Sequence, residues 1–221
     1  MRTALLTLVL CLTAAVALEG CTGPNAEHYN TRGIESFRLR EYRTAQAAFQ
    51  QAVELEPTSA EYQYNLAAAC QAVGDLDTAV YHYNMAVTIH PGMLKAYENM
   101  ARCYVAMDKP ATAERTYERA CASNPLSAVP YYQFALYHLA GGNKAAAEEY
   151  FRKAVATDPS SALAHELLGE FLIENGNREE GLAHYKKSLQ LRPLNPQLSK
   201  ELDMLEPAPS APPPETPEAA H

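Results

Sequence analysis

The chain has 221 residues, of which 48 % are hydrophobic and 20 % are charged, and its formal net charge is −8. This composition supplies enough apolar material for a folded core. The excess of negative charge, with no basic stripe along the chain, argues against a nucleic-acid-binding protein, because phosphate groups would be repelled.

The first residues are typical of an export signal. Arg2 precedes an apolar stretch that is too short to span a membrane comfortably. We therefore expect a bacterial signal peptide over residues 1–20 and a tether over residues 21–25. The segment Leu18-Glu19-Gly20-Cys21 resembles a lipobox, in which the cysteine becomes the lipid-modified first residue of the mature protein.

The lipobox resemblance implies that Cys21 carries lipid, including palmitate. Thr22, which follows it, favours the outer membrane by similarity to enterobacterial sorting, so the protein would face the periplasm. Two other interpretations remain open. Cleavage after Ala15-Val16-Ala17 would release a soluble periplasmic protein, and an uncleaved segment would act as a membrane anchor.

The region from residue 26 to residue 195 is a repeat with a fixed period. Five prolines stand 34 residues apart: Pro57, Pro91, Pro125, Pro159 and Pro193. The period divides the region into five units, 26–59, 60–93, 94–127, 128–161 and 162–195. A constant period in this range indicates a stack of identical supersecondary units.

Four further positions recur in every unit, three of them small and one aromatic. The small positions are Gly33/Ala67/Ala101/Ala135/Gly169, Ala45/Ala79/Ala113/Ala147/Gly181 and Ala52/Ala86/Ala120/Ala154/Ser188. The aromatic position is Phe49/Tyr83/Tyr117/Phe151/Tyr185. We expect the small residues to let helices approach closely and the aromatic ring to fill the space between them.

Each unit contains two segments of about 14 residues with apolar residues at helical spacing, so we expect two helices per unit and an all-α protein. Gly74, Gly142 and Gly176 fall at the turn between them, where positive φ is often needed. Asp108 suits that position and Arg40 suits it poorly. The recurring proline is expected to end the second helix, because the residue before proline avoids the α region.

After the repeats, residues 196–205 have the pattern of a short helix that would cap the stack, with Leu198, Leu202 and Leu205 on its apolar side. Residues 206–221 are rich in proline and have no apolar periodicity. They are expected to form a disordered tail rather than a ligand for proline-binding domains.

The repeat length and the recurring residues resemble the tetratricopeptide repeat (TPR) family, with its pattern W-x₂-L-G-x₂-Y…A-x₃-F…P. The resemblance implies a right-handed TPR superhelix, an α-solenoid of five helix-turn-helix repeats with a C-terminal capping helix. It also implies a non-enzymatic scaffold that binds a protein or an extended peptide in a groove lined by the first helix of each repeat.

The family's groove positions are the second, fifth, sixth, ninth and twelfth residues of each unit. The sixth position offers a row of hydrogen-bonding side chains that could hold a peptide backbone, and tyrosines in the fifth position could be interface anchors or could simply cover neighbouring helices. The predicted groove residues are Asn30, Thr31, Ile34, Tyr64, Asn65, Lys95, Glu98, Asn99, Arg102, Tyr132, Gln133 and Leu136. Only Asn65 and Lys95 match the clamp with which some TPR proteins hold chaperone C-termini, so that activity is not expected.

Catalytic and metal-binding motifs are not predicted. His165-Glu166 lacks the second histidine of a zinc-protease helix. His138 and His165 fall at helix positions where other repeats place packing residues. Cys70, Cys103 and Cys121 lie on apolar helix positions and are expected to be core residues, although a disulfide between Cys70 and Cys103 remains conceivable in an oxidising compartment. We predict no cofactor, no metal and no enzymatic activity.

The leading hypothesis is therefore an envelope lipoprotein that acts as a protein-interaction scaffold. A lipobox followed by TPRs resembles the layout of lipoproteins in pilus assembly. An adaptor for cell-wall hydrolases is a second hypothesis, and an enzyme or substrate-binding subunit with its site in the groove is a third.

Overall fold

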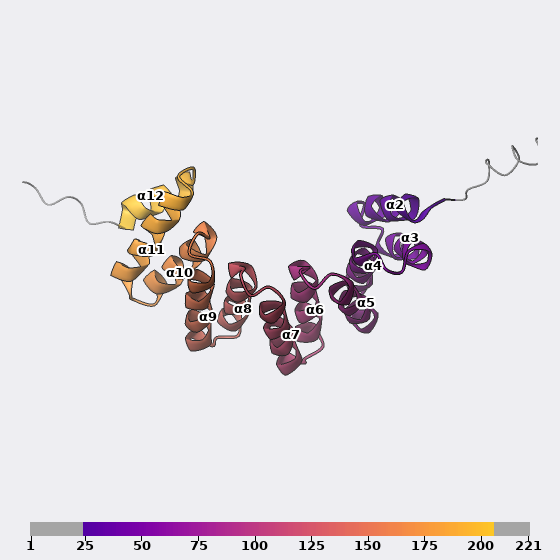
Figure 1. Ribbon diagram of the computed structural model, residues 1–221, viewed down its shortest axis with the longest axis horizontal. Helices are drawn as coiled ribbons and strands as arrows, with labels where there is room; N and C mark the ends of the chain where they lie inside the picture. Colours follow the sequence, from indigo (N-terminus) through magenta and orange to yellow (C-terminus); the bar gives the residue numbers. More distant parts are fainter. Residues whose placement is uncertain (1–23, 206–221) are drawn as a thin grey trace, which may run out of the picture. The chain divides into compact units, whose positions relative to one another are not determined.

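The computed structural model describes residues 24–205, which form helices and the connections between them (Figure 1). This part of the chain contains eleven α-helices and no strand, which confirms the predicted all-α class. The predicted signal peptide, the lipidation residue Cys21 and the predicted tail over 206–221 lie outside the described residues, so these expectations stay predictions.

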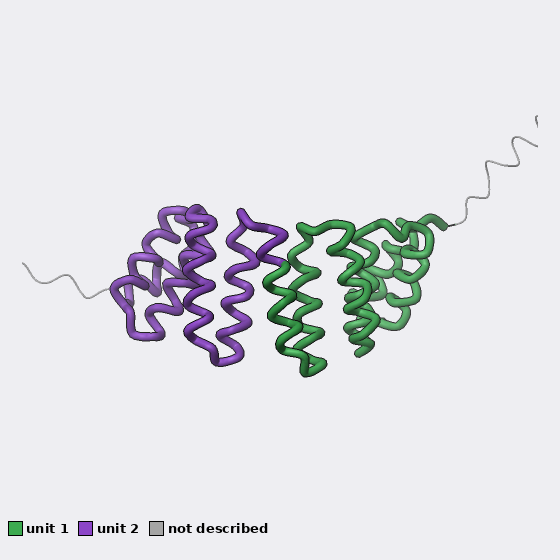
Figure 2. The backbone as a smooth tube through the Cα atoms, turned by 60° about the horizontal axis from the view of Figure 1, so that its bottom comes forward, with its two compact units in different colours: residues 1–119 green, residues 120–221 purple. Residues whose placement is uncertain are grey.

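The helices fall into two compact units that divide between Arg119 and Ala120 (Figure 2). The first unit holds α2 (Ala26–Arg38), α3 (Tyr42–Leu55), α4 (Ala60–Val73), α5 (Leu76–Ile89), α6 (Leu94–Ala106) and most of α7 (Pro110–Ser123). The second unit holds the end of α7 with α8 (Ala128–Ala140), α9 (Lys144–Thr157), α10 (Ala162–Glu174), α11 (Arg178–Leu191) and α12 (Pro196–Leu205).

The packing order within each unit is that of a helical repeat. In the first unit α3 packs between α2 and α4, and α5 packs between α4 and α6. In the second unit α9 packs between α8 and α10, and α11 packs between α10 and α12. Because these helices pack against their sequence neighbours, the core of each unit is distributed along the chain instead of gathered in one centre.

The turns within the repeats have the predicted left-handed residue. Gly74, Gly142 and Gly176 have φ of 89°, 77° and 90°, while Arg40 and Asp108 have φ of 63° and 56°. A side chain with a β-carbon is strained in this region, so Arg40 is the least suitable of the five residues, as expected from the sequence.

The recurring prolines end the second helices, as predicted. α3 ends at Leu55, and Glu56, which precedes Pro57, leaves the helical region with φ −134° and ψ 76°. The residues before Pro91, Pro159 and Pro193 have nearly the same conformation. Pro110 begins α7, where its missing N–H would have had no partner inside the helix.

The recurring small and aromatic residues form the core, which confirms their predicted role. All five aromatic residues of the repeat column are buried, with Tyr83 0 % and Tyr117 6 % exposed. The alanines around them, including Ala45, Ala67 and Ala79, are fully buried. Small side chains therefore bring the helices close enough for one ring per repeat to fill the remaining space.

The last repeat departs from the alanine pattern for a steric reason. A β-carbon on Gly181 would lie 2.8 Å from the carbonyl oxygen of Gly169, so the backbones of α10 and α11 are in direct contact here. α12 then covers the free side of α11, where Leu198 and Leu202 pack with Tyr185 in one buried cluster. The predicted capping helix is therefore confirmed.

Candidate functional site

The first unit contains a pocket of about 520 Å³ between its helices. Ligand pockets in proteins have volumes of roughly 300–1,000 Å³, so this one is large enough for a bulky side chain of a partner. Its lining comes from five successive helices, α2 to α6: Ile34, Phe37, Arg38, Phe49, Tyr64, Asn65, Ala68, Gln71, Ala72, Tyr83, Asn99 and Arg102.

The floor of the pocket is made by two rings of the recurring aromatic column. Phe49 and Tyr83 are 2 % and 0 % exposed. The Tyr83 hydroxyl donates a hydrogen bond of 2.7 Å to Oε1 of Gln71, and burial raises the pKa of this phenol. Its polar atom is therefore satisfied within the protein, and the remaining floor is apolar.

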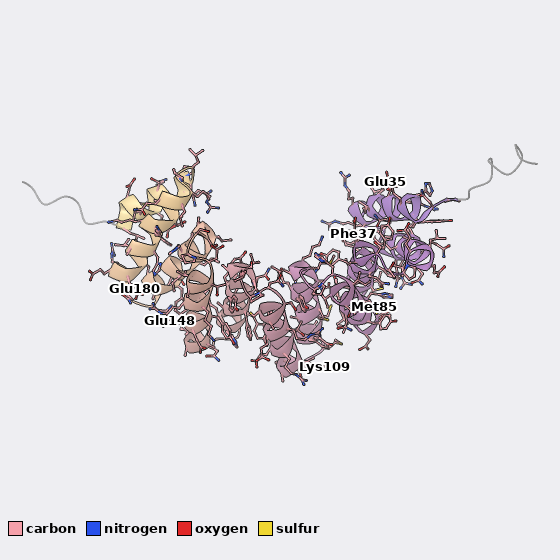
Figure 3. All side chains as sticks on the ribbon, in the orientation of Figure 1. Glu35, Phe37, Met85, Lys109, Glu148 and Glu180 are labelled. Atoms are coloured by element: carbon pink, nitrogen blue, oxygen red, sulfur yellow. The ribbon has the colours of Figure 1, made fainter. Side chains whose placement is uncertain are left out.

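The rim carries side chains that reach solvent. Ile34 is 39 % exposed, and Arg38, Ala72 and Arg102 are also exposed. Phe37 projects from the side of α2 opposite to Glu35 (Figure 3) and lines the pocket. The pocket is therefore apolar at its base and bears two guanidinium groups at its edge.

The predicted row of hydrogen-bonding side chains is present on the first helices of the repeats, but its members bond to one another. Asn65 Nδ2 donates to Asn30 Oδ1 at 2.8 Å, and Asn99 Nδ2 donates to the Tyr64 hydroxyl at 3.1 Å. In both pairs the donor stands 35 residues after the acceptor, so the bond joins neighbouring positions of adjacent repeats. Asn30 is buried and holds Asn65 in place.

Tyr64 is the point where several of these contacts meet. Its ring lies 5.6 Å from the Tyr83 ring, and Lys95 Nζ lies 4.4 Å above its centre, which is a cation–π arrangement. Burial raises the pKa of the Tyr64 phenol, and the hydrogen bond from Asn99 opposes this effect. Tyr64 therefore covers the neighbouring helix and still forms part of the pocket wall.

The structure brings together some of the predicted groove residues and not others. Ile34, Tyr64, Asn65, Asn99 and Arg102 line the pocket. Asn30 and Lys95 contact lining residues, whereas Thr31 and Glu98 do not line it. The predicted residues Tyr132, Gln133 and Leu136 are on α8 in the second unit, where Leu136 is 41 % exposed.

Several lining residues were absent from the predicted set. Phe37 and Gln71 are twelfth residues of their repeats and Ala68 is a ninth residue, so their positions were groove positions by the family pattern. Arg38 lies one helical turn after Ile34, and helical spacing could have identified it. The sequence did not predict that Phe49 and Tyr83 lie at the base of a pocket. The same aromatic position recurs in every repeat, whether its ring lies only in the core or also beneath a pocket.

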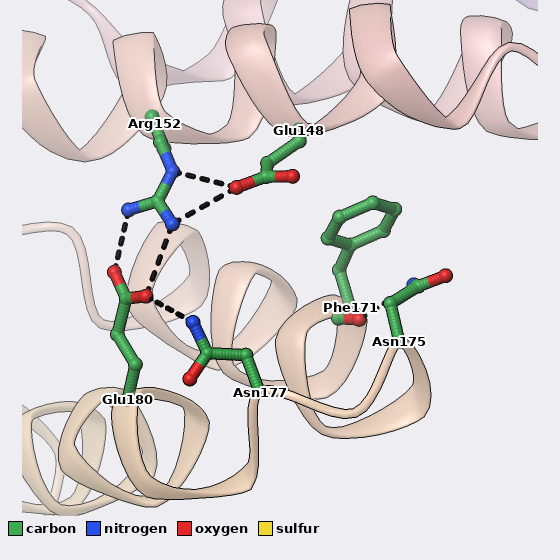
Figure 4. Close-up of polar contacts among 6 residues, drawn as sticks. All are labelled: Glu148, Arg152, Phe171, Asn175, Asn177 and Glu180. Carbon is green, nitrogen blue, oxygen red and sulfur yellow. Dashed lines mark hydrogen bonds and ion pairs between the residues drawn. The ribbon is translucent and has the colours of Figure 1, made fainter.

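A polar network on the surface of the second unit joins α9 to the start of α11 (Figure 4). Arg152 of α9 pairs with Glu148 at 2.9 Å and with Glu180 of α11 at 2.5 Å, and Asn177 Nδ2 also donates to Glu180. These groups are exposed, so the pairs contribute at most about 1 kcal/mol each. Their role is structural, because they tie α9 to the start of α11.

The histidines and cysteines singled out in the repeats are core groups, as predicted. His138 packs against both Phe134 and Tyr150, with ring centroids 4.5 and 5.5 Å away, and these two rings also contact each other at 4.3 Å. His165 is buried and bonds to the carbonyl of Pro159 and, at 2.8 Å, to Nδ1 of His184.

Cys70 and Cys103 are buried and carry free thiols, so no disulfide joins them, and Cys121 is buried as well. Burial raises the pKa of the Cys103 thiol to about 11, which keeps it protonated and unreactive. Within residues 24–205 no group of three or more His, Cys, Asp or Glu side chains could hold a metal ion. No helix in that range is long and apolar enough to cross a membrane.

Comparison with known proteins agrees with this architecture. Models of the tetratricopeptide repeat match residues 30–93 and 132–196, and a further one matches residues 94–125. No curated protein matches the chain at a significant level of sequence similarity.

Solved structures share the fold at low sequence identity. TTC0263, a thermophilic TPR protein of Thermus thermophilus, is 22 % identical with a TM-score of 0.54, over 81 % of this chain and 98 % of that one. Pseudomonas aeruginosa PilF is 17 % identical with a TM-score of 0.56, over 81 % of this chain and 83 % of that one. PilW, a type IV pilus biogenesis factor, is 18 % identical with a TM-score of 0.55, over 81 % and 85 %.

Identities this low support the fold alone, whereas the repeat models cover most of the described residues. Both agree with the 34-residue period, the buried aromatic column and the paired helices. Proteins built from this repeat are protein-interaction scaffolds. The chain belongs to the tetratricopeptide repeat family.

Proposed function

We propose that this protein is a non-enzymatic scaffold that binds a protein or an extended peptide, and that the pocket of the first unit is its principal binding site. The observation that carries the proposal is the combination of accessible apolar lining, from Ile34, Phe37 and Ala68 over the buried Phe49 and Tyr83 rings, with amide side chains on the adjacent first helices. An apolar pocket with a few well-placed polar groups is the usual form of a binding site.

The amide row supports an extended partner. Asn65 and Asn99 each use one N–H group on a neighbouring side chain, and these bonds fix the orientation of both amides. Their Oδ1 atoms accept no hydrogen bond from the described residues. Each can therefore accept the backbone N–H of a bound chain, one per repeat.

The binding proposal is tested by affinity capture with two matched double variants. Tyr64→Ala with Asn99→Ala removes the pocket wall and its hydrogen bond, and we expect the captured partner to be lost. Tyr81→Ala with Asn84→Ala changes the same residue types on the exposed side of α5 and should leave capture unchanged. Equal capture by both variants would contradict a binding site in this pocket.

We further propose that the protein is an outer-membrane lipoprotein that faces the periplasm, anchored by lipid on Cys21. The support is the export signal and the lipobox-like segment in the sequence. Metabolic labelling with palmitate should mark the wild-type chain and not Cys21→Ser. Labelling that persists in Cys21→Ser would refute the anchor, and an unlabelled wild-type chain in the periplasmic fraction would favour the soluble alternative.

We propose more specifically that the protein acts in pilus or secretion assembly. The order of its segments, an export signal with a lipobox-like sequence followed by repeats, favours this role. The fold likeness to PilF and PilW is compatible with it. Identification of the captured partner decides the matter, because a pilus or secretin component would support this role. A cell-wall hydrolase would instead support the adaptor hypothesis.

A further inference from the structure

We propose that the pocket of the first unit selects a peptide segment in which a bulky apolar side chain stands next to an acidic side chain. This proposal rests on the proposed peptide-binding function and adds the chemical class of the partner. It is carried by the charges at the rim of the pocket.

The rim is positively charged although the chain as a whole is negative. Arg38 and Arg102 line the pocket, and no Asp or Glu residue does. Neither guanidinium forms an ion pair or a hydrogen bond with any residue in the range 24–205. In a chain with a formal net charge of −8, two unpaired guanidiniums beside one pocket indicate a preference for a negatively charged ligand.

The two arginines approach the pocket from different helices. Arg38 is at the end of α2 and Arg102 is on α6, and both helices contact α4. A carboxylate held at this rim can accept paired hydrogen bonds from a guanidinium, a geometry that lysine does not offer. Lys95, which lies over the Tyr64 ring, adds a third positive charge near the same wall.

Two acidic side chains lie near this rim, but neither lines the pocket. Glu35 projects from the other side of α2 than Phe37 (Figure 3). Glu98 acts on the Tyr64 phenol through its charge but does not line the pocket. A ligand carboxylate would therefore meet arginine side chains first.

The base of the pocket requires an apolar group beside that carboxylate. Ile34, Phe37 and Ala68 give it accessible apolar surface, and the buried Phe49 and Tyr83 rings lie beneath them, with the Tyr83 hydroxyl already bonded to Gln71. A free small anion would leave this surface uncovered, whereas a peptide can place an aromatic or branched aliphatic side chain there. The apolar side chain and the carboxylate would then be held by different parts of the same pocket.

The test is a selection of short random peptides, displayed on phage, against the full-length protein and its variants. The wild-type chain should enrich peptides that carry Phe, Leu, Ile or Met within two residues of Asp or Glu. The double charge reversal Arg38→Glu with Arg102→Glu should enrich Lys or Arg at the acidic position instead. Arg115→Glu, an exposed arginine on α7, should select the same peptides as the wild type.

The affinity of the leading peptide, measured by fluorescence anisotropy, should fall at least tenfold in the charge-reversed variant. A peptide with an amidated C-terminus should bind as well as the free acid, because the ligand carboxylate is a side chain. Loss of binding on amidation would assign the carboxylate to a chain terminus and overturn the proposal.

A second variant separates this proposal from the proposed function. Ala72→Trp fills the pocket from an exposed position and should abolish peptide binding. If selected peptides lack acidic residues and still fail to bind Ala72→Trp, the charge preference is wrong and the binding site stands. If they bind Ala72→Trp as tightly as the wild type, or if no peptide is enriched, both proposals fail.

Discussion

The contact between Gly169 and Gly181 leads to a quantitative prediction for Gly181→Ala. The added β-carbon would lie 2.8 Å from the Gly169 carbonyl oxygen and 2.5 Å from Cγ1 of Ile173. Normal contacts between nonbonded carbon atoms are about 3.5–4.0 Å. The Ile173 side chain can move, but the Gly169 oxygen belongs to the backbone of α10, so the two helices must separate.

The expected loss of stability follows from two opposing effects. Overpacking a closely packed site costs about 1–3 kcal/mol. Alanine is a better helix former than glycine by about 1 kcal/mol, which offsets part of this cost. We therefore expect Gly181→Ala to lower the free energy of unfolding by roughly 1–2 kcal/mol, or Tm by several degrees.

The measurement is thermal unfolding followed by circular dichroism, with Gly141→Ala as the matched control. A β-carbon on Gly141 would meet its nearest atoms at 3.5 and 3.6 Å, and its φ is −80°. Gly141→Ala should therefore unfold at or slightly above the wild-type temperature. If Gly181→Ala is as stable as Gly141→Ala, the close approach of α10 and α11 is not required by the fold.

Three further predictions concern local conformation, titration and the capping helix. Arg40→Gly should raise the stability by about 0.5–1 kcal/mol in urea unfolding, because a non-glycine residue at positive φ is strained; an unchanged midpoint would contradict this strain. Burial lowers the pKa of His165 and His184 in the folded protein. As the pH falls, the unfolded chain therefore takes up protons before the folded chain does. The free energy of unfolding should be full above about pH 6.5 and should decrease as the pH drops below it. Urea midpoints at pH 7.5 and 5.5 should differ less for His165→Gln than for the wild type, and an equal difference would exclude the pair as its source. Leu202→Ala should lower the free energy of unfolding by about 2 kcal/mol, because it opens the cluster around Tyr185. An effect no larger than that of the same substitution at an exposed leucine would show that α12 does not cap the stack.

His165→Gln is a mild substitution because the first unit already contains its equivalent. Gln63 donates to the carbonyl of Pro57 at 2.8 Å and bonds to Nδ1 of His82 at 2.7 Å. His165 makes the same two kinds of contact three repeats later, with Pro159 and His184. The variant therefore removes a titrating group while it keeps both hydrogen bonds.

Most of the fold could be predicted from the sequence because the same residue types recur at the same positions of each repeat and have the same local effect. The proline ends a helix through the conformation of the residue before it, and the small positions permit close helix contact. The left-handed turn residue was also predictable, including the poor fit of Arg40. The contact between Gly169 and Gly181 was not, because glycine at a small position looks like a tolerated replacement for alanine.

The candidate site was only partly predictable. Helical position identified the residues on the first helices, but not which hydrogen bonds they form within the protein. Asn30 looked available to a partner and is instead buried against Asn65. The pocket itself depends on how the Phe49 and Tyr83 rings pack, and on side chains such as Arg38 that lie beyond the family's groove positions.

Photo-crosslinking from inside the pocket tests the central claim most directly. A photoreactive amino acid at Ala72, which is exposed and lines the pocket, should crosslink to the captured partner. The same amino acid at Thr88, exposed on α5 outside the pocket, should not. A partner that crosslinks from Thr88 and not from Ala72 would place binding elsewhere and contradict the proposed site.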